Sequence, residues 1–286
     1  MQDTAFSETE HIRKRYDKGE GEVTLMYEMP KTPGQGNDEM YNPENLTPAV
    51  SPLNGKTLAA LGSSITYGYG SEGIAFPEMI AKIDQCRFIK QAISGMTLAC
   101  VPERPETHPE GSYVRQLLDM IDPSEKIDAF VVQLSTNDAQ KGIEMGKISD
   151  SYASEDQDQG TIIGAMEFIL AYIRETWNCP VIFYINAYLD RGYLEFFSAK
   201  SPAIQISVDD ACKNLIVNYE NMIHALYELQ KKWHFRIADL WNNEDIRNAS
   251  YELRDRMMSD PIHPRKSGYL FWYVPEIEKC LYEAFV

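Results

Sequence analysis

The sequence has few cysteines and no long hydrophobic run. Its five cysteines are an odd number, and no two of them form a C-x-x-C pair, which argues against a disulfide framework and a structural zinc site. No run of about 18 apolar residues occurs, so we expect no membrane span. The N-terminus also lacks the apolar stretch of a signal peptide, which favours a cytoplasmic protein.

Positive charge is scarce as well. The chain has 27 Lys and Arg against 43 Asp and Glu, which gives a net charge of -16. Such a charge repels phosphate backbones and anionic lipid surfaces, so nucleic acid is not expected as a partner. A small-molecule ligand is compatible with this charge, and a homo-oligomer stays open. The length of 286 residues is ample for one large domain with a buried core.

The chain divides into a polar N-terminal part and a part with regular hydrophobic patterns. Residues 1–52 are rich in Pro, Gly, Asn and Glu, which predicts an extended N-terminal arm without a core of its own. The pattern changes near Lys56. We therefore expect residues 53–286 to form one folded domain.

Five short apolar segments in this second part alternate with helical patterns. The predicted strands are 56–61, 87–93, 128–135, 180–187 and 235–240, and the predicted helices are 76–83, 112–121, 160–177, 209–233 and the tail after 267. Helical spacing puts Met166, Ile169 and Ile173 on one face. The alternation predicts an α/β protein with a parallel sheet between two helix layers. Ligands bind such sheets outside the carboxyl ends of their strands.

The segment after the first predicted strand, GSSITYGYGSEG, has two interpretations. Gly68, Gly70 and Gly73 match the G-x-G-x-x-G dinucleotide fingerprint, but they lie too far beyond the strand. The fingerprint also expects an acidic residue at the end of the second strand, where this chain has Lys90-Gln91. The second interpretation makes a serine beside Gly62 a nucleophile at the sheet edge. Taken alone, the segment favours Ser63 and Ser64 as caps of the following turn or helix.

A serine hydroxyl needs a base, and that base is usually a histidine held by a carboxylate. His263 follows the fifth predicted strand, and Asp260 precedes it by one turn of backbone. Asp260 can therefore orient the imidazole while His263 takes the serine proton, and the adjacent Pro261 and Pro264 stiffen the loop. The sequence has four other histidines, which we interpret as structural or solvated: His11, His108, His224 and His234.

An acyl-transfer site also needs donors for an oxyanion. Gly95 follows the second predicted strand and could present its backbone N–H without a side chain in the way. Asn137 follows the third and could offer its side-chain amide. Each segment alone is a common loop sequence, but complementary groups follow four of the predicted strands.

The order GSSIT, S-G-x-T, S-T-N-D and D-x-x-H-P resembles the SGNH (GDSL-type) hydrolase superfamily over about residues 54–286. The resemblance implies a flavodoxin-like α/β/α sandwich with a five-stranded parallel sheet, so 53–286 would be its catalytic domain. It implies Ser64 as nucleophile, with Asp260 and His263 as triad partners. It also implies an oxyanion hole made by the Ser64 and Gly95 N–H groups and the Asn137 side chain.

The activity implied by this resemblance is that of a serine esterase without metal or other cofactor. Its substrates would carry short acyl groups, such as acetyl, on carbohydrates, small lipids or small esters. The alternative is a catalytically inactive SGNH-fold protein that binds a small ester or sugar. The acidic segment 155–158 could suggest calcium, but we prefer to interpret it as a solvated acidic loop, and we predict no metal site.

Three residues depart from the usual pattern of the superfamily. Ser63 replaces an Asp before the nucleophile, Ser135 replaces a Gly and could crowd its turn, and Lys90 or Gln91 replaces an Asn after the second strand. These changes leave the catalytic atoms in place. Two interpretations stay open for the aromatic side chains of Tyr188, Tyr193 and Phe196: they line the acyl or sugar pocket, or they belong to a hydrophobic helix packed on the core.

Overall fold

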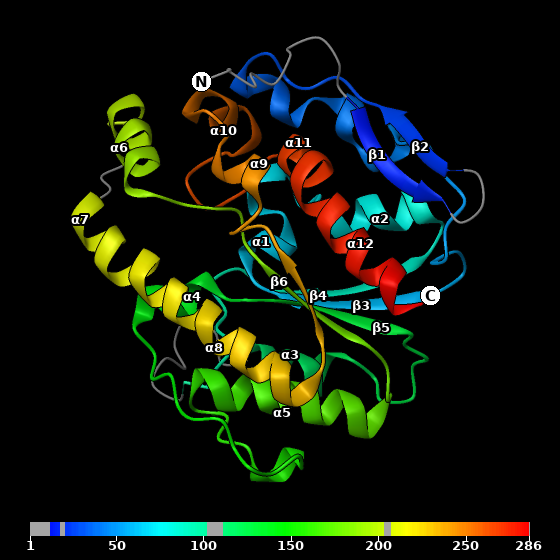
Figure 1. The fold of residues 1–286 in the computed structure, drawn as a ribbon, viewed down its shortest axis with the longest axis vertical. Coiled ribbons are helices and arrows are strands. Elements are labelled where there is room, and N and C mark those ends of the chain that lie inside the picture. The colour runs from blue at the N-terminus through cyan, green and yellow to red at the C-terminus, as the bar shows by residue number, and fades with distance from the viewer. Residues whose placement is uncertain (1–11, 18–20, 102–110, 203–206, 286) are drawn as a thin grey trace.

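The computed structural model describes residues 12–17, 21–101, 111–202 and 207–285. Its centre is a five-stranded parallel sheet in the order β4-β3-β5-β6-β7, which is 2-1-3-4-5 counted along the chain (Figure 1). The strands are β3 (Thr57–Gly62), β4 (Arg87–Ala92), β5 (Ala129–Gln133), β6 (Val181–Ile185) and β7 (Arg236–Asp239). Each lies within or beside a predicted strand. The predicted fold class is confirmed.

Helices cover both faces of this sheet, because its strands carry apolar side chains on both faces. In β3, Ala59 and Leu61 point to one core, and Leu58 and Ala60 to the other. The first core is closed by α3 (Tyr113–Met120), α5 (Ile162–Thr176) and α8 (Val217–Trp233). The second core is closed by α2 (Phe76–Asp84) and α12 (Val274–Ala284).

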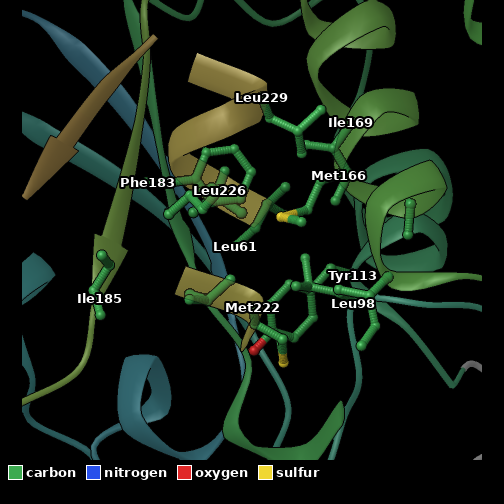
Figure 2. Packing of buried hydrophobic residues seen from close by; sticks show 14 of the residues in the cluster. Leu61, Leu98, Tyr113, Met166, Ile169, Phe183, Ile185, Met222, Leu226 and Leu229 are labelled. Carbon is green, nitrogen blue, oxygen red and sulfur yellow. The ribbon is translucent and has the colours of Figure 1, made fainter. Parts of the chain in front are cut away.

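The first core confirms the predicted apolar face of residues 160–177. Met166 and Ile169 of α5 face Leu226 and Leu229 of α8 (Figure 2). All four side chains are fully buried. The two long helices therefore pack against each other as well as against the sheet.

Two of the predicted helices are present as continuous helices, each interrupted by a π-helical turn. In the segment predicted at 209–233, α7 (Val208–Ala211) runs through the turn Cys212–Ile216 into α8. In the tail, α11 (Lys266–Gly268) runs through Tyr269–Tyr273 into α12. Pro275 lies just after the second π-helical turn, where a proline without an N–H interrupts the regular α-helical hydrogen bonds.

Several short elements have no strong hydrophobic period and lie outside the predicted strands and helices. They are α1 (Ser64–Tyr67), α4 (Thr136–Lys141), α6 (Arg191–Lys200), α9 (Glu244–Arg247), α10 (Tyr251–Met257), the antiparallel pair β1 (Ile12–Asp17) and β2 (Gly21–Met26), and 3-10 turns at Pro33–Asn37, Glu39–Tyr41, Pro43–Asn45, Tyr69–Ser71 and Ser154–Asp156. A helix is nevertheless one of the two interpretations of the segment that contains α6. Among the described helices, none is long and apolar enough to span a bilayer.

Part of the N-terminal segment packs onto the domain. Tyr41 and Leu46 are buried in the second core, and the Tyr41 ring meets the edge of Phe271 with its centroid 6.2 Å away. The Tyr41 hydroxyl donates to the Glu28 carbonyl at 2.5 Å. The division of the chain at residue 52 stays a prediction, and residues 1–11 and 18–20 of the predicted arm lie outside the described ranges.

Candidate active site

Ser64 is the first residue of α1. The chain makes a tight turn between the carboxyl end of β3 at Gly62 and this helix. The Gln133 side chain holds this turn: its Oε1 accepts from the Ser63 N–H at 3.0 Å and from the Thr66 hydroxyl at 2.8 Å. Gly62 is required here because a Cβ at this position would collide with the Thr66 side chain. The turn presents Ser64 at the sheet edge with 8% of its surface exposed.

Ser64, His263 and Asp260 form one hydrogen-bonded chain. His263 Nε2 lies 2.8 Å from Ser64 Oγ, and His263 Nδ1 lies 2.7 Å from Asp260 Oδ2. Because a carboxylate accepts hydrogen bonds, Nδ1 carries the proton and Nε2 is left to accept from the serine. The structure thus brings together three side chains that the sequence places up to 199 positions apart.

The loop that carries Asp260 and His263 is fixed by its own hydrogen bonds. Asp260 Oδ1 accepts from the N–H groups of Ile262 and His263, each at 2.8 Å, and Ser259 N–H donates to the His263 carbonyl at 2.8 Å. Burial raises the pKa of Asp260, but hydrogen bonds and charge attraction from His263, together with the two N–H groups, lower this pKa below its ordinary value. Asp260 is therefore a carboxylate at neutral pH.

Gly95 and Asn137, the predicted oxyanion donors, both line a cavity that also contains Ser64 and His263. Gly95 has a φ of +85°, a conformation that glycine adopts without strain. Asn137 Nδ2 donates one hydrogen bond to the Met96 carbonyl at 2.7 Å. This bond fixes the amide plane and leaves the second Nδ2 hydrogen for another acceptor.

Ser135 and Asp138 hold Asn137 in place. The Ser135 hydroxyl caps α4 by accepting from the N–H groups of Asn137 at 3.2 Å and Asp138 at 3.4 Å. The backbone φ of Ser135 is -79°, a conformation that does not require glycine, so serine does not crowd this turn. The buried Asp138 carboxylate accepts from the N–H groups of Leu98 at 2.7 Å and Ala99 at 3.1 Å, and burial raises its pKa to about 6.

Two other departures from the superfamily pattern also have local partners. The buried Ser63 hydroxyl accepts from Gln133 Nε2 at 3.2 Å. Lys90 pairs with Glu78 at 2.6 Å and donates to the carbonyls of Tyr67 at 3.1 Å and Gly73 at 2.9 Å. Lys90 therefore fastens the loop that follows the candidate nucleophile.

Gln133 and Asp138 are supporting residues to which the sequence analysis gave no role. Asp138 belongs to the S-T-N-D segment, but only Asn137 of that segment was predicted to have a role in the site. Gln133 gave a signal that could have been used: it is a polar residue in an otherwise apolar, buried strand, where an unpaired amide would be unfavourable. Its partners could not be named before the fold was known.

The cavity in front of Ser64 has a volume of about 290 Å³. It is lined by Ser64, Tyr69, Ser94, Gly95, Thr136, Asn137, Gln140, Ile262 and His263. None of these nine residues is Asp, Glu, Lys or Arg, and the cavity wall combines hydroxyl and amide groups with apolar surface. The Tyr69 ring lies 5.0 Å from the His263 ring and is mostly exposed at the rim.

The three aromatic candidates for substrate contacts are not among the residues that line this cavity. Tyr193 is buried and its ring stacks on Phe196 at a centroid distance of 6.2 Å. Tyr188 packs edge-on against Trp241 at 5.2 Å, with the Arg247 guanidinium over its ring. These side chains make packing contacts, and a role for them in substrate binding stays a prediction.

The two other histidines in the described ranges do not line this cavity. His224 lies on the exposed side of α8, and His234 ends that helix. His11 and His108 lie outside the described residues. Within the described ranges, no three or more His, Cys, Asp or Glu side chains are grouped so as to hold a metal ion.

Comparison with known proteins finds the fold but no sequence relative. No protein-family model and no curated protein sequence matches the chain. Among solved structures, a carbohydrate acetylesterase family member from Sinorhizobium meliloti is 14% identical, with a TM-score of 0.53 over 80% of this chain and 99% of that one. The M. smegmatis aryl esterase is 11% identical, with a TM-score of 0.54 over 80% and 99%.

A protein from Bacteroides ovatus, provisionally named a GDSL-like lipase, is 14% identical, with a TM-score of 0.51 over 80% of this chain and 99% of that one. The structural neighbours are thus SGNH/GDSL-like hydrolases and acetylesterases. Identities this low concern the fold alone. The chain has the SGNH hydrolase fold, as the four motifs predicted.

Proposed function

We propose that the protein is a serine esterase that hydrolyses short-chain acyl esters. The observation that carries this proposal is the hydrogen-bonded chain from Ser64 through His263 to Asp260, which opens onto a cavity. Such a chain activates a hydroxyl that is otherwise a weak nucleophile. A binding protein would have no need of an imidazole aligned between a hydroxyl and a carboxylate.

The proposed reaction has two halves. Ser64 Oγ attacks the ester carbonyl while His263 Nε2 takes its proton, and the oxyanion is held by the N–H groups of Ser64 and Gly95 and the Asn137 amide. The intermediate collapses to an acyl-serine as His263 gives its proton to the departing alcohol. Water then attacks the acyl-serine, with His263 again as base, and the acid leaves from a regenerated Ser64.

Cavity size and chemistry support a small, neutral substrate. A volume of about 290 Å³ is at the lower end of ligand pockets, which favours a short acyl group such as acetyl. The lining contains no Asp, Glu, Lys or Arg side chain, which favours a neutral substrate, and its hydroxyl and amide groups can bind the hydroxyls of a sugar or a small alcohol. The acetylesterase and aryl esterase among the neighbours agree with this range.

A fluorophosphonate probe followed by peptide mass spectrometry tests the proposal directly. We expect one adduct, on Ser64, because the probe reacts with serines whose proton a nearby base can take. Prior heat denaturation should remove the labelling. An adduct on a different serine would contradict the assignment of Ser64. No adduct, together with no ester hydrolysis, would favour the inactive binding protein.

Asn137→Ala is expected to lower kcat by about 10²- to 10³-fold, the usual effect of losing one oxyanion donor. KM should change little, since the amide would bind the oxyanion more strongly than the ground-state carbonyl. Steady-state kinetics with p-nitrophenyl acetate would measure both constants. The melting temperature should be recorded in parallel because Asn137 Nδ2 also donates to Met96. An unchanged kcat in a folded variant would exclude Asn137 from the oxyanion hole.

A further inference from the structure

Two separate loops must stay in register for the proposed chemistry. The first, the Ser64 loop, comprises residues 64–73 and carries the candidate nucleophile. The second, the His263 loop, comprises residues 259–266 and carries Asp260 and His263. Asn37, from the N-terminal segment, bonds to both. Its Nδ2 donates to the Gly70 carbonyl at 3.0 Å, and its Oδ1 accepts from the Lys266 N–H at 3.0 Å.

The side chain of Lys266 strengthens this connection. It is only 3% exposed, and its ammonium group donates to the Asn37 carbonyl at 3.1 Å and pairs with Glu72 at 2.6 Å. A buried ammonium group is unfavourable unless it keeps its partners. Those partners come from the N-terminal segment and from the loop after α1, so the burial of Lys266 depends on all three segments being together.

Glycines allow these segments to approach closely. A Cβ on Gly70 would lie against the Ser259 side chain, the Pro264 carbonyl and His263 Cβ. A Cβ on Gly36 would lie against the Arg256 carbonyl and the Arg265 side chain. Gly70, which belongs to the G-x-G-x-x-G pattern in the sequence, is therefore explained by contact with the His263 loop.

We infer that Asn37 is a positioning residue that holds the Ser64 loop and the His263 loop at their working separation. This inference rests on the proposed esterase function. Asn37 does not line the cavity, so it acts through the two loops and not on the substrate. The distance that it protects is the one from Ser64 Oγ to His263 Nε2, and shifts of about 1 Å at such a distance can slow a reaction up to 10²-fold.

Asn37→Ala is the test, with Asn45→Ala as its matched control. Asn45 lies in the same N-terminal segment, but its Nδ2 donates locally to the Glu39 carbonyl. We expect Asn37→Ala to lower kcat with p-nitrophenyl acetate by about 10-fold while KM stays within about twofold, since the cavity wall is intact. Hydrogen–deuterium exchange should become faster in peptides covering residues 66–73 and 258–268. Asn45→Ala should leave kcat and both peptides unchanged.

Asn37→Asp separates the two halves of the connection. Aspartate still accepts from the Lys266 N–H but cannot donate to the Gly70 carbonyl, so only residues 66–73 should exchange faster. Wild-type kcat and exchange in both variants would overturn the inference and leave the esterase proposal standing. Absence of turnover and of probe labelling in the wild-type protein would overturn the esterase proposal, and the exchange data would then decide alone whether Asn37 holds the two loops.

Discussion

Replacing Ser64 with alanine is expected to abolish hydrolysis of p-nitrophenyl acetate. The substitution removes the only atom that lies 2.8 Å from His263 Nε2 in the proposed nucleophilic position, so no acyl-enzyme can form. Removal of the serine nucleophile from a Ser-His-Asp triad lowers the rate by about 10⁴-fold or more. The rate acceleration that remains comes from the oxyanion donors and substrate binding. The measurement is kcat/KM against buffer hydrolysis.

Ser124→Ala is a suitable control for this experiment. Ser124 is exposed in the turn before β5, at the amino ends of the strands, and its hydroxyl bonds only to Asp122 among the described residues. We expect wild-type activity from it. Ser64→Ala should keep the wild-type circular dichroism spectrum because only one oxygen is lost. Undiminished turnover by Ser64→Ala would end the serine esterase proposal.

His263→Ala is expected to lower kcat by about 10²- to 10⁴-fold, the usual contribution of a general base. Ser64 would keep its hydroxyl but lose the acceptor for its proton. Asp260 cannot take over, because it contacts Nδ1 and not Ser64. Reaction with the fluorophosphonate probe should slow in parallel, since the probe and the ester both need an activated serine.

His224→Ala provides the matched control for the histidine. His224 is exposed on α8 and takes no part in the site, so its removal should leave the rate unchanged. Equal rates for His263→Ala and the wild-type protein would show that the 2.8 Å contact has no catalytic use. A loss in both histidine variants would instead point to unspecific hydrolysis by surface imidazoles.

The sheet could be predicted from the sequence because parallel strands buried on both faces are continuous apolar runs. Segments such as 128–135 and 180–187 are too short for core helices and lie between long amphipathic ones. Once the strands are assigned, their carboxyl ends must share one edge. That rule explains why Ser64, Asn137 and His263 could be assigned to one site from the sequence, although they are far apart in the chain.

The contacts that hold these side chains in place could not be predicted in the same way. Gln133 bonds to the turn of Ser64, Asp138 bonds to the loop after β4, and Asn37 bonds to two loops at once. Each contact depends on the angle at which two remote segments meet, and hydrophobic periodicity carries no information about such angles. The short helix α10 escaped prediction for a related reason, since tertiary packing and not its own pattern stabilises it.

The burial of Tyr41 and Leu46 matters to anyone who shortens the chain for expression. A fragment trimmed to residues 53–286 would keep every strand of the sheet and every proposed catalytic atom. It would nevertheless expose Phe271 and its neighbours in the second core to water. It would also remove the Asn37 carbonyl, which accepts a hydrogen bond from the buried Lys266 ammonium group. A fragment for expression should therefore begin before Asn37, although the first strand of the sheet begins only at Thr57.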